Sequence, residues 1–325
     1  MNRLIIFFCL VFVFLFTNTG IAFAANSGIS ESMLKNPEIL QQWEQYKTFY
    51  ENALDKGKGE GLPSSEYMKE MERLVYESAR TGEDLKPSPK ILREMEKQYE
   101  ETMKKVHKEM LNAELQDVNN LSVKSISIVN KGSTYTFNQA DCGSSGEHGD
   151  TVGGKFKHDW GCDSGGWADA LTSYNPTINP ALFTHTATTW ATVGKKIKVN
   201  GTGNARIYFN GEYGYSLIGN GTAPMALSVG TIVAVIYDLT DGVEKKRKVI
   251  HKQQNPLPIP SMYEDSFNEY IDLELEDDHV YTLKLGVEAY CSGAGSCYAD
   301  LINYGDNPGA GDDGVDYNYI KITWR

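Results

Sequence analysis

Residues 231–251 read TIVAVIYDLTDGVEKKRKVIH, and this stretch decides the fold class. Thr231–Leu239 is rich in β-branched and aromatic residues, which favour strands. Asp241-Gly242 follows, and an Asp-Gly pair readily adopts the positive φ angles that a tight hairpin turn requires. A second strand is expected over Val243–His251, so the stretch predicts an antiparallel β-hairpin.

The same signals continue on both sides of this hairpin, from Leu121 to the C-terminus. Alternating or β-branched segments recur, and they are Ile271–Glu276, Val280–Ala289 and Tyr317–Trp324. Asn-Gly pairs occur at 200–201, 210–211 and 220–221. The pair at 210–211 predicts another hairpin between Ile207–Phe209 and Glu212–Tyr215. Regularly spaced strands without helical patterns between them indicate an antiparallel β-sandwich, jelly-roll-like, over residues 119–325.

Residues 25–118 differ from this region because their apolar residues recur at helical spacing. The stripes run from Leu40 to Leu54, from Tyr67 to Ser78 and from Ile91 to Leu115, with breaks at Lys56–Pro63 and Gly82. We expect an N-terminal helical bundle or hairpin in which the stripes pack against one another. Self-association through these helices is the alternative. The whole chain is thus expected to be an α+β multidomain protein.

Residues 1–24 have the features of a secretory signal peptide. Arg3 precedes the apolar run Leu4–Phe16, and Ala22-Phe23-Ala24 places small residues two apart, as a signal peptidase site requires. A retained membrane anchor is less favoured, because the run is shorter than the roughly 20 residues that span a bilayer. We expect a secreted, extracellular protein with no membrane attachment after cleavage.

Cleavage removes Cys9 and leaves an even number of cysteines, which are Cys142, Cys162, Cys291 and Cys297. Export exposes them to an oxidising compartment, where disulfides form. Three pairings are open, and pairing of neighbours, 142–162 and 291–297, closes the shortest loops. Zinc binding is disfavoured because these spacings lack the tight pairs of zinc sites.

The formal net charge of −12 comes from 31 basic and 43 acidic residues. A general nucleic-acid binder needs a basic face that displaces counterions from phosphates, so this class is excluded. A basic run at Lys245–Lys248 is typical of an edge strand, where lysine blocks edge-to-edge association, and binding of an anionic polymer is the alternative. Acidic residues alternate along Asp272–Glu276, as on the solvent face of a strand.

The most acidic segment is the Gly-rich loop 306–316, whose aspartates are Asp306, Asp312, Asp313 and Asp316. Ca²⁺ takes six to eight oxygen ligands on flexible backbone, so this loop predicts a calcium site. The spacing is not that of an EF-hand. An acidic turn before the last strand is the alternative.

Aromatic residues of the β region suggest a ligand platform, formed by Tyr208, Tyr213, Tyr215 and Trp190. Sugars present apolar C–H faces that stack on such rings. Burial of the rings in the sheet core is the alternative. Residues 276–325, with His279–Leu283 and Asp316–Ile322, resemble the late strands of exported prokaryotic β-sandwich modules, including carbohydrate-binding ones. That resemblance implies a fold neighbourhood and no functional residue.

No catalytic residue is assigned. Asp163-Ser164-Gly165-Gly166 resembles the nucleophile segment of trypsin-like serine proteases, but too few β-type residues precede it for the barrel that carries the His and Asp. We therefore expect a secreted, non-catalytic protein that binds glycan or another surface ligand. A structural or assembly protein of a cell surface or matrix, and a secreted glycosidase or peptidase, are the alternatives.

Overall fold

The computed structural model describes residues 65–82, 89–120, 126–150, 154–163, 166–176, 185–218, 226–256, 261–293, 297–301 and 314–325, with single positions between 35 and 51. The chain divides into two compact units, one of residues 1–59 and 63–86 and one of residues 60–62 and 87–325. The predicted signal peptide lies outside the described residues. None of the helices in the described part of the chain is long and apolar enough to cross a membrane.

The first unit contains helix α3 (Ser65–Thr81). Val75 and Ala79 of α3 are fully buried, and Trp43 is buried as well. Lys47 Nζ lies 2.9 Å from Glu72 Oε1, so an ion pair joins the segment around residue 47 to α3. The predicted bundle of three helices is not what these residues form, because the third helix belongs to the other unit.

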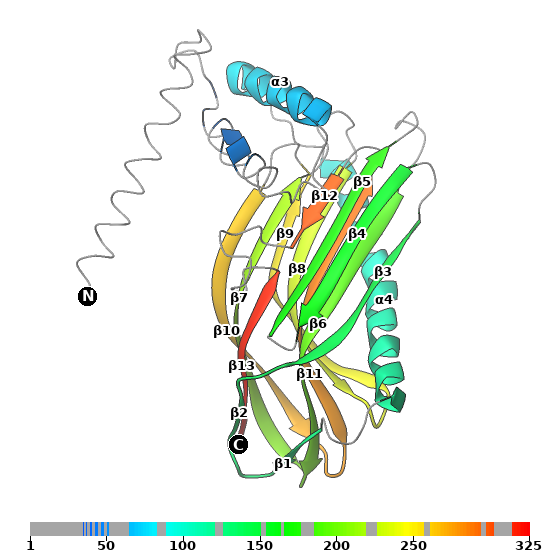
Figure 1. Cartoon of the computed structure of the whole chain (residues 1–325), viewed down its shortest axis with the longest axis vertical. Coiled ribbons are helices and arrows are strands. Elements are labelled where there is room, and N and C mark those ends of the chain that lie inside the picture. The colour runs from blue at the N-terminus through cyan, green and yellow to red at the C-terminus, as the bar shows by residue number, and fades with distance from the viewer. Residues whose placement is uncertain are drawn as a thin grey trace, which may run out of the picture. The chain divides into compact units, whose positions relative to one another are not determined.

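The second unit contains two β-sheets (Figure 1). The first, sheet A, consists of β1 (Ser127–Asn130), β3 (Asp141–Asp150), β6 (His185–Asn200), β8 (Ala226–Asp238), β9 (Val243–Asn255) and β11 (Val280–Gly293). The second, sheet B, consists of β2 (Tyr135–Phe137), β4 (Gly154–Asp163), β5 (Trp167–Pro176), β7 (Gly203–Ile218), β10 (Ser261–Leu275), β12 (Cys297–Asp300) and β13 (Val315–Trp324).

The strand order is β1-β6-β11-β8-β9 in sheet A, with β3 also paired to β6, and β10-β7-β12-β5-β13-β2 in sheet B, with β4 paired to β5. The pairs between named strands are antiparallel except for β1 with β6. Apolar residues of the two facing sheets form one buried core, for example Leu283 and Val287 of β11 with Ile207 and Phe209 of β7. The predicted β-sandwich is confirmed at this level.

The hairpin at Asp241-Gly242 is confirmed, because β8 and β9 pair across it and Gly242 has φ 68°. The prediction of a hairpin at Asn210-Gly211 is wrong. Both residues lie inside β7, which pairs with β10 on one side and with β13 on the other. A Cβ at Gly211 would collide with the Asp316 carbonyl oxygen and lie 2.8 Å from the Phe267 ring. The glycine thus permits close approach of a neighbouring strand rather than a turn.

Helix α4 (Pro89–Asn120) packs on the outer face of sheet A (Figure 1). Its apolar stripe contacts aromatic and aliphatic side chains of the sheet, and this buried cluster contains Met95, Tyr99, Met103, Val106, Met110, Trp190, Leu227, Val229, Val235, Tyr237 and Tyr290. The stripe therefore packs on the sheet and not on another helix. The predicted division at residue 118 falls within α4, whereas the compact units divide near residue 86.

The edge strands β9 and β10 are joined by opposite charges. Lys248 Nζ lies 2.6 Å from Glu269 Oε2, and Lys245 Nζ lies 2.8 Å from Glu276 Oε1. Lys246 donates to the Asp272 carbonyl oxygen at 3.1 Å. The basic run of β9 thus contacts β10, and Glu276 directly after β10, across one edge of the sandwich.

Candidate functional site

The outer face of sheet B carries polar and aromatic side chains. Ile207 and Phe209 of β7 are buried in the core between the sheets, so the alternate residues Tyr208, Asn210 and Glu212 project to the other side. Helix α4 packs on sheet A, and no helix among the described residues of this unit covers sheet B. The outer face of sheet B is therefore the surface on which a ligand could lie.

A pocket of about 330 Å³ is hollowed into this face where β7, β10 and β13 lie side by side. Its lining consists of Glu212, Tyr213, Gly214, Glu264, Asp265, Ser266, Gly314 and Asp316. Glu212 stands opposite Ser266 on β10 and Asp316 on β13, so side chains from three strands meet here.

The acidic side chains that line this pocket are hydrogen-bond acceptors. Gly214 donates its backbone N–H to the Gly314 carbonyl oxygen at 3.0 Å, and neither residue brings a side chain into the space. Glu212 and Glu264 are exposed and Asp316 is half-buried. Ionised carboxylates accept hydrogen bonds and donate none. The pocket therefore suits a ligand that presents hydroxyl or ammonium groups.

Two tyrosines lie farther along the same strands. Tyr208 of β7 and Tyr270 of β10 are cross-strand partners with ring centroids 6.0 Å apart. The Arg206 guanidinium lies 3.8 Å from the centre of the Tyr270 ring, and Asp272 holds that guanidinium through bonds of 2.8 and 2.9 Å. Tyr270 is 42% exposed, so a large part of its surface remains open to a ligand.

The predicted platform of four aromatic residues is not formed. Tyr208 is on the outer face of sheet B, but Tyr213 and Tyr215 belong to the core between the sheets and are 8% and 7% exposed. Trp190 is buried beneath α4 on the other sheet. The three tyrosines are separated because side chains alternate along β7, with odd-numbered ones pointing inward and even-numbered ones outward. Sequence reasoning missed Tyr270, although it lies on a strand of alternating character.

Tyr215 instead stacks with His251 and Tyr263 between the edge strands, and the Tyr213 ring contacts the same two rings at a tilt. His251 and Tyr263 are 5.6 Å apart and nearly parallel, and the Tyr215 hydroxyl lies 3.2 Å from His251 Nε2. Burial lowers the pKa of His251, which favours the neutral ring. Burial raises the pKa of Tyr213 and of Tyr215 to about 12. These rings close one end of the β9–β10 edge.

Of the four predicted calcium ligands, the structure describes Asp316, which lines the pocket. Asp306, Asp312 and Asp313 lie outside the described residues, so the calcium site remains a prediction. Cys291 is buried, with Sγ 3.4 Å from the Thr172 carbonyl oxygen. The side chains of Cys142, Cys162 and Cys297 also lie outside the description, and the disulfides remain predictions.

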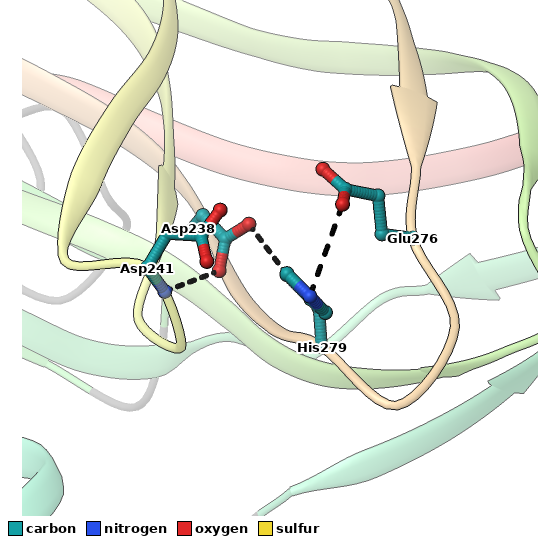
Figure 2. A group of neighbouring side chains, drawn as sticks. All are labelled: Asp238, Asp241, Glu276 and His279. Atoms are coloured by element: carbon teal, nitrogen blue, oxygen red, sulfur yellow. Dashed lines mark hydrogen bonds and ion pairs between the residues drawn. The ribbon is translucent and has the colours of Figure 1, made fainter.

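A separate polar cluster joins the β8–β9 turn to the β10–β11 turn (Figure 2). It consists of Asp238, Asp241, Glu276 and His279, whose possible ligand atoms all lie within 4.8 Å of one another. Asp238 is fully buried and accepts hydrogen bonds from His279 Nδ1 at 2.9 Å and from the backbone N–H of Asp241 at 3.2 Å. Sequence reasoning identified the turn at Asp241 but not this cluster.

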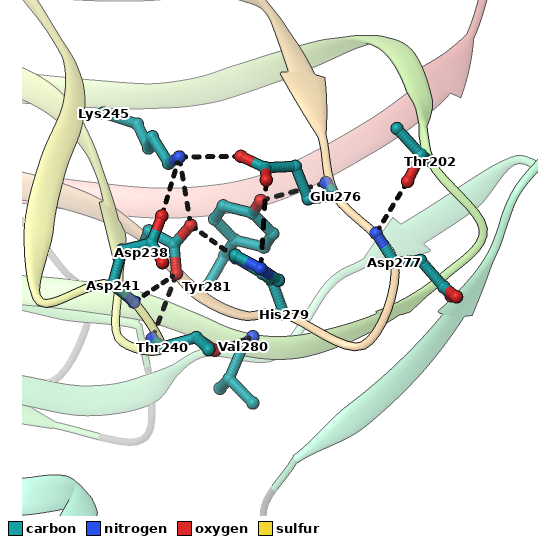
Figure 3. A network of polar contacts seen from close by, with 10 residues as sticks. All are labelled: Thr202, Asp238, Thr240, Asp241, Lys245, Glu276, Asp277, His279, Val280 and Tyr281. Atoms are coloured by element: carbon teal, nitrogen blue, oxygen red, sulfur yellow. Dashed lines mark hydrogen bonds and ion pairs between the residues drawn. The ribbon is translucent and has the colours of Figure 1, made fainter.

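Lys245 supplies the positive charge of the cluster (Figure 3). Its Nζ lies 2.8 Å from Glu276, 3.2 Å from Asp241 and 3.3 Å from Asp238. These hydrogen bonds, the one to Glu276 first, raise the pKa of Lys245. Oxygen and imidazole ligands could hold a divalent cation, but the ammonium already compensates the carboxylates. The cluster is therefore an ion-pair network that fastens two turns together.

No family model and no curated protein matches the sequence. Among solved structures, one similarity is to a chain described as TmCBM61 in complex with β-1,4-galactotriose. The two are 10% identical, the match covers 56% of this chain and 88% of that chain, and the TM-score is 0.16. A TM-score this low carries no argument about fold or ligand, so the β-sandwich assignment rests on the two sheets themselves.

Proposed function

We propose that this is a secreted, non-catalytic protein that binds glycan on the outer face of sheet B. The observation that carries the proposal is the carboxylate-lined pocket at Glu212, Glu264 and Asp316, on a face that α4 does not cover. Export through residues 1–24, predicted from the sequence, would bring that face to extracellular polysaccharides.

The pocket and the tyrosine pair together match the chemistry of a sugar chain. Carboxylates accept hydrogen bonds from sugar hydroxyls, and an exposed tyrosine ring stacks against the apolar C–H face of a sugar ring. Glu212 and Tyr208 are four residues apart on β7, which is about 13 Å along a strand. A ligand that uses both ends of this face is therefore longer than one monosaccharide.

A calcium ion belongs to the same proposal. Asp316 lines the pocket, and Asp312 and Asp313 precede Gly314 directly in the chain. With Asp306, these aspartates offer the hard oxygen ligands that Ca²⁺ takes. Such an ion at the rim would coordinate sugar hydroxyls or order the loop 306–316.

A glycosidase would need two carboxylates that are free to act as acid and base or nucleophile, and ion pairs hold two of the acidic side chains along Asp272–Glu276. Asp272 is held by Arg206 at 2.8 Å and Glu276 by Lys245 at 2.8 Å, so neither is placed as a free general acid or base. Ser164 lies outside the described residues. No particular observation favours the alternative of a structural or assembly protein.

Binding to a broad panel of immobilised polysaccharides tests the proposal. Tyr270→Ala and Glu212→Gln should each weaken the binding of the recognised glycan about tenfold, which corresponds to the loss of about 1.4 kcal/mol. Glu274→Gln is the matched control, because Glu274 is exposed on β10 near Asn204, at the other end of the strand from the pocket. Absence of binding across the panel, or equal binding by all variants, would contradict the proposed site.

A further inference from the structure

Lys284 and Glu114 form a charge pair that is sealed between α4 and sheet A. Lys284 lies in β11, the central strand of the sheet, and Glu114 lies near the end of α4. Each side chain is only 1% exposed. Burial of two charges is costly unless they are well paired and hydrogen-bonded.

The pairing of Lys284 with Glu114 is unusually loose. Nζ lies 3.8 Å from Oε2, beyond hydrogen-bond distance, whereas the half-exposed pair Lys248–Glu269 is separated by 2.6 Å. The more deeply buried pair thus has the longer separation, although a buried pair of charges needs close contact to offset the cost of its desolvation. The two groups are held near contact without a hydrogen bond between them.

The two oxygens of Glu114 have different surroundings. Oε1 accepts hydrogen bonds from Ser144 Oγ at 2.6 Å, from Ser144 N at 3.2 Å and from Thr192 Oγ1 at 3.4 Å. Oε2, the oxygen that faces Lys284, is buried and accepts no hydrogen bond in the structure. One oxygen is thus held as a carbonyl oxygen would be, and the other occupies the position where an amide has its nitrogen.

We propose that Lys284 and Glu114 are joined by a side-chain amide. A proton passes from the Lys284 ammonium to Oε2 of Glu114, and the lone pair that this frees on Nζ attacks Cδ, so that the Cδ–N bond forms and the Cδ–Oε2 bond breaks. Starting from the ammonium and the carboxylate, Oε2 leaves with two protons of Nζ as one water molecule. Nothing is oxidised or reduced, so the step needs no co-reactant.

The surroundings of the pair promote this condensation. Its product is neutral, so it removes two charges from a site that water does not reach. The Ser144 N–H, the Ser144 hydroxyl and the Thr192 hydroxyl surround Oε1, where negative charge develops during attack. The fold also holds the two reacting groups together, which replaces an encounter in solution.

The mass of the full, reduced chain tests the proposal directly. We expect the folded protein to be lighter by one water molecule than the sequence of the same chain without any signal peptide that has been removed, and we expect trypsin not to cleave after Lys284. Peptide mapping should recover a fragment of α4 containing Glu114 linked to a fragment of β11 containing Lys284.

Variants assign the linkage. Lys284→Met and Glu114→Ala should each restore the full sequence mass, whereas Lys195→Met should keep the deficit, because Lys195 pairs with Asp141 on the same sheet. If wild-type protein has the full sequence mass and is cleaved after Lys284, the proposal is overturned. That reading needs only the wild-type chain, so it does not depend on whether a variant folds.

Discussion

Asp238 shows how a fully buried carboxylate keeps its charge. Burial by itself raises the pKa of this group, but hydrogen bonds from His279, the Asp241 backbone and Lys245 outweigh burial, and the pKa is lowered from its usual 3.8. The hydrogen bond to Asp238 raises the pKa of His279 above its usual 6.5. The two residues therefore stabilise the fold over different pH ranges.

The pH dependence of unfolding follows from the signs of these shifts. The Asp238 contribution is complete above pH 3.8 and is lost as the pH falls through its lowered native pKa. The His279 contribution is complete below pH 6.5 and is lost as the pH rises through its raised native pKa. In urea titrations, we expect His279→Gln to destabilise the protein most between these values and less at alkaline pH.

His251 provides the matched control, because burial lowers its pKa. A histidine that is neutral in the fold opposes folding when it is protonated, so His251→Gln should improve relative stability as the pH falls below 6.5. Equal effects of His279→Gln at every pH would contradict the role assigned to the ion-pair network.

At the scale of single elements, the sequence predicted turns and apolar helix stripes, but it did not always predict which neighbouring segments they contact. Asp241-Gly242 makes the predicted turn, whereas Asn210-Gly211 lies inside β7 because β13 approaches Gly211 closely. Local sequence does not distinguish these outcomes, since both depend on which strand lies alongside. Likewise, the stripe of α4 was predictable, but its docking on Trp190 and Tyr290 of sheet A was not.

The docking of α4 can be tested at its buried stripe. Met110 is fully buried against sheet A, so Met110→Ala should lower the free energy of unfolding by about 2–5 kcal/mol. Lys108→Ala, on the exposed side of the same helix, should change it by less than about 0.5 kcal/mol. Urea unfolding followed by circular dichroism measures both. Equal effects would mean that the stripe does not pack as described.

At the scale of the whole molecule, the sequence predicted the β-sandwich, and the predicted boundary between the helical and the β region at residue 118 stays a prediction. The change from helical to strand periodicity near residue 118 marks a change of secondary structure, not of compact unit. At the candidate site, the sequence predicted Tyr208 and Asp316 as ligand-binding residues but did not predict the pocket. It arises because β7, β10 and β13 are neighbours, and no single segment contains that information.

Truncation distinguishes the two boundaries. A chain that starts at residue 87 should keep the unfolding midpoint of the sandwich unit, because it retains α4. A chain that starts at residue 119 should be less stable and should bind the dye ANS, since it would uncover Trp190, Tyr237 and Tyr290. Equal stability of the two chains would support the boundary at residue 118.

The charged contacts between β9 and β10 also make the protein sensitive to salinity. Dissolved ions screen partly exposed pairs such as Lys248–Glu269 and Lys245–Glu276 but barely affect stacked rings. At high salt concentration, the stacked rings of Tyr215, His251 and Tyr263 would therefore contribute more to holding this edge together than the ion pairs would. Local unfolding of the sandwich would then begin at the end of this edge that carries the ion pairs, so the salt concentration would determine which part of the edge opens first.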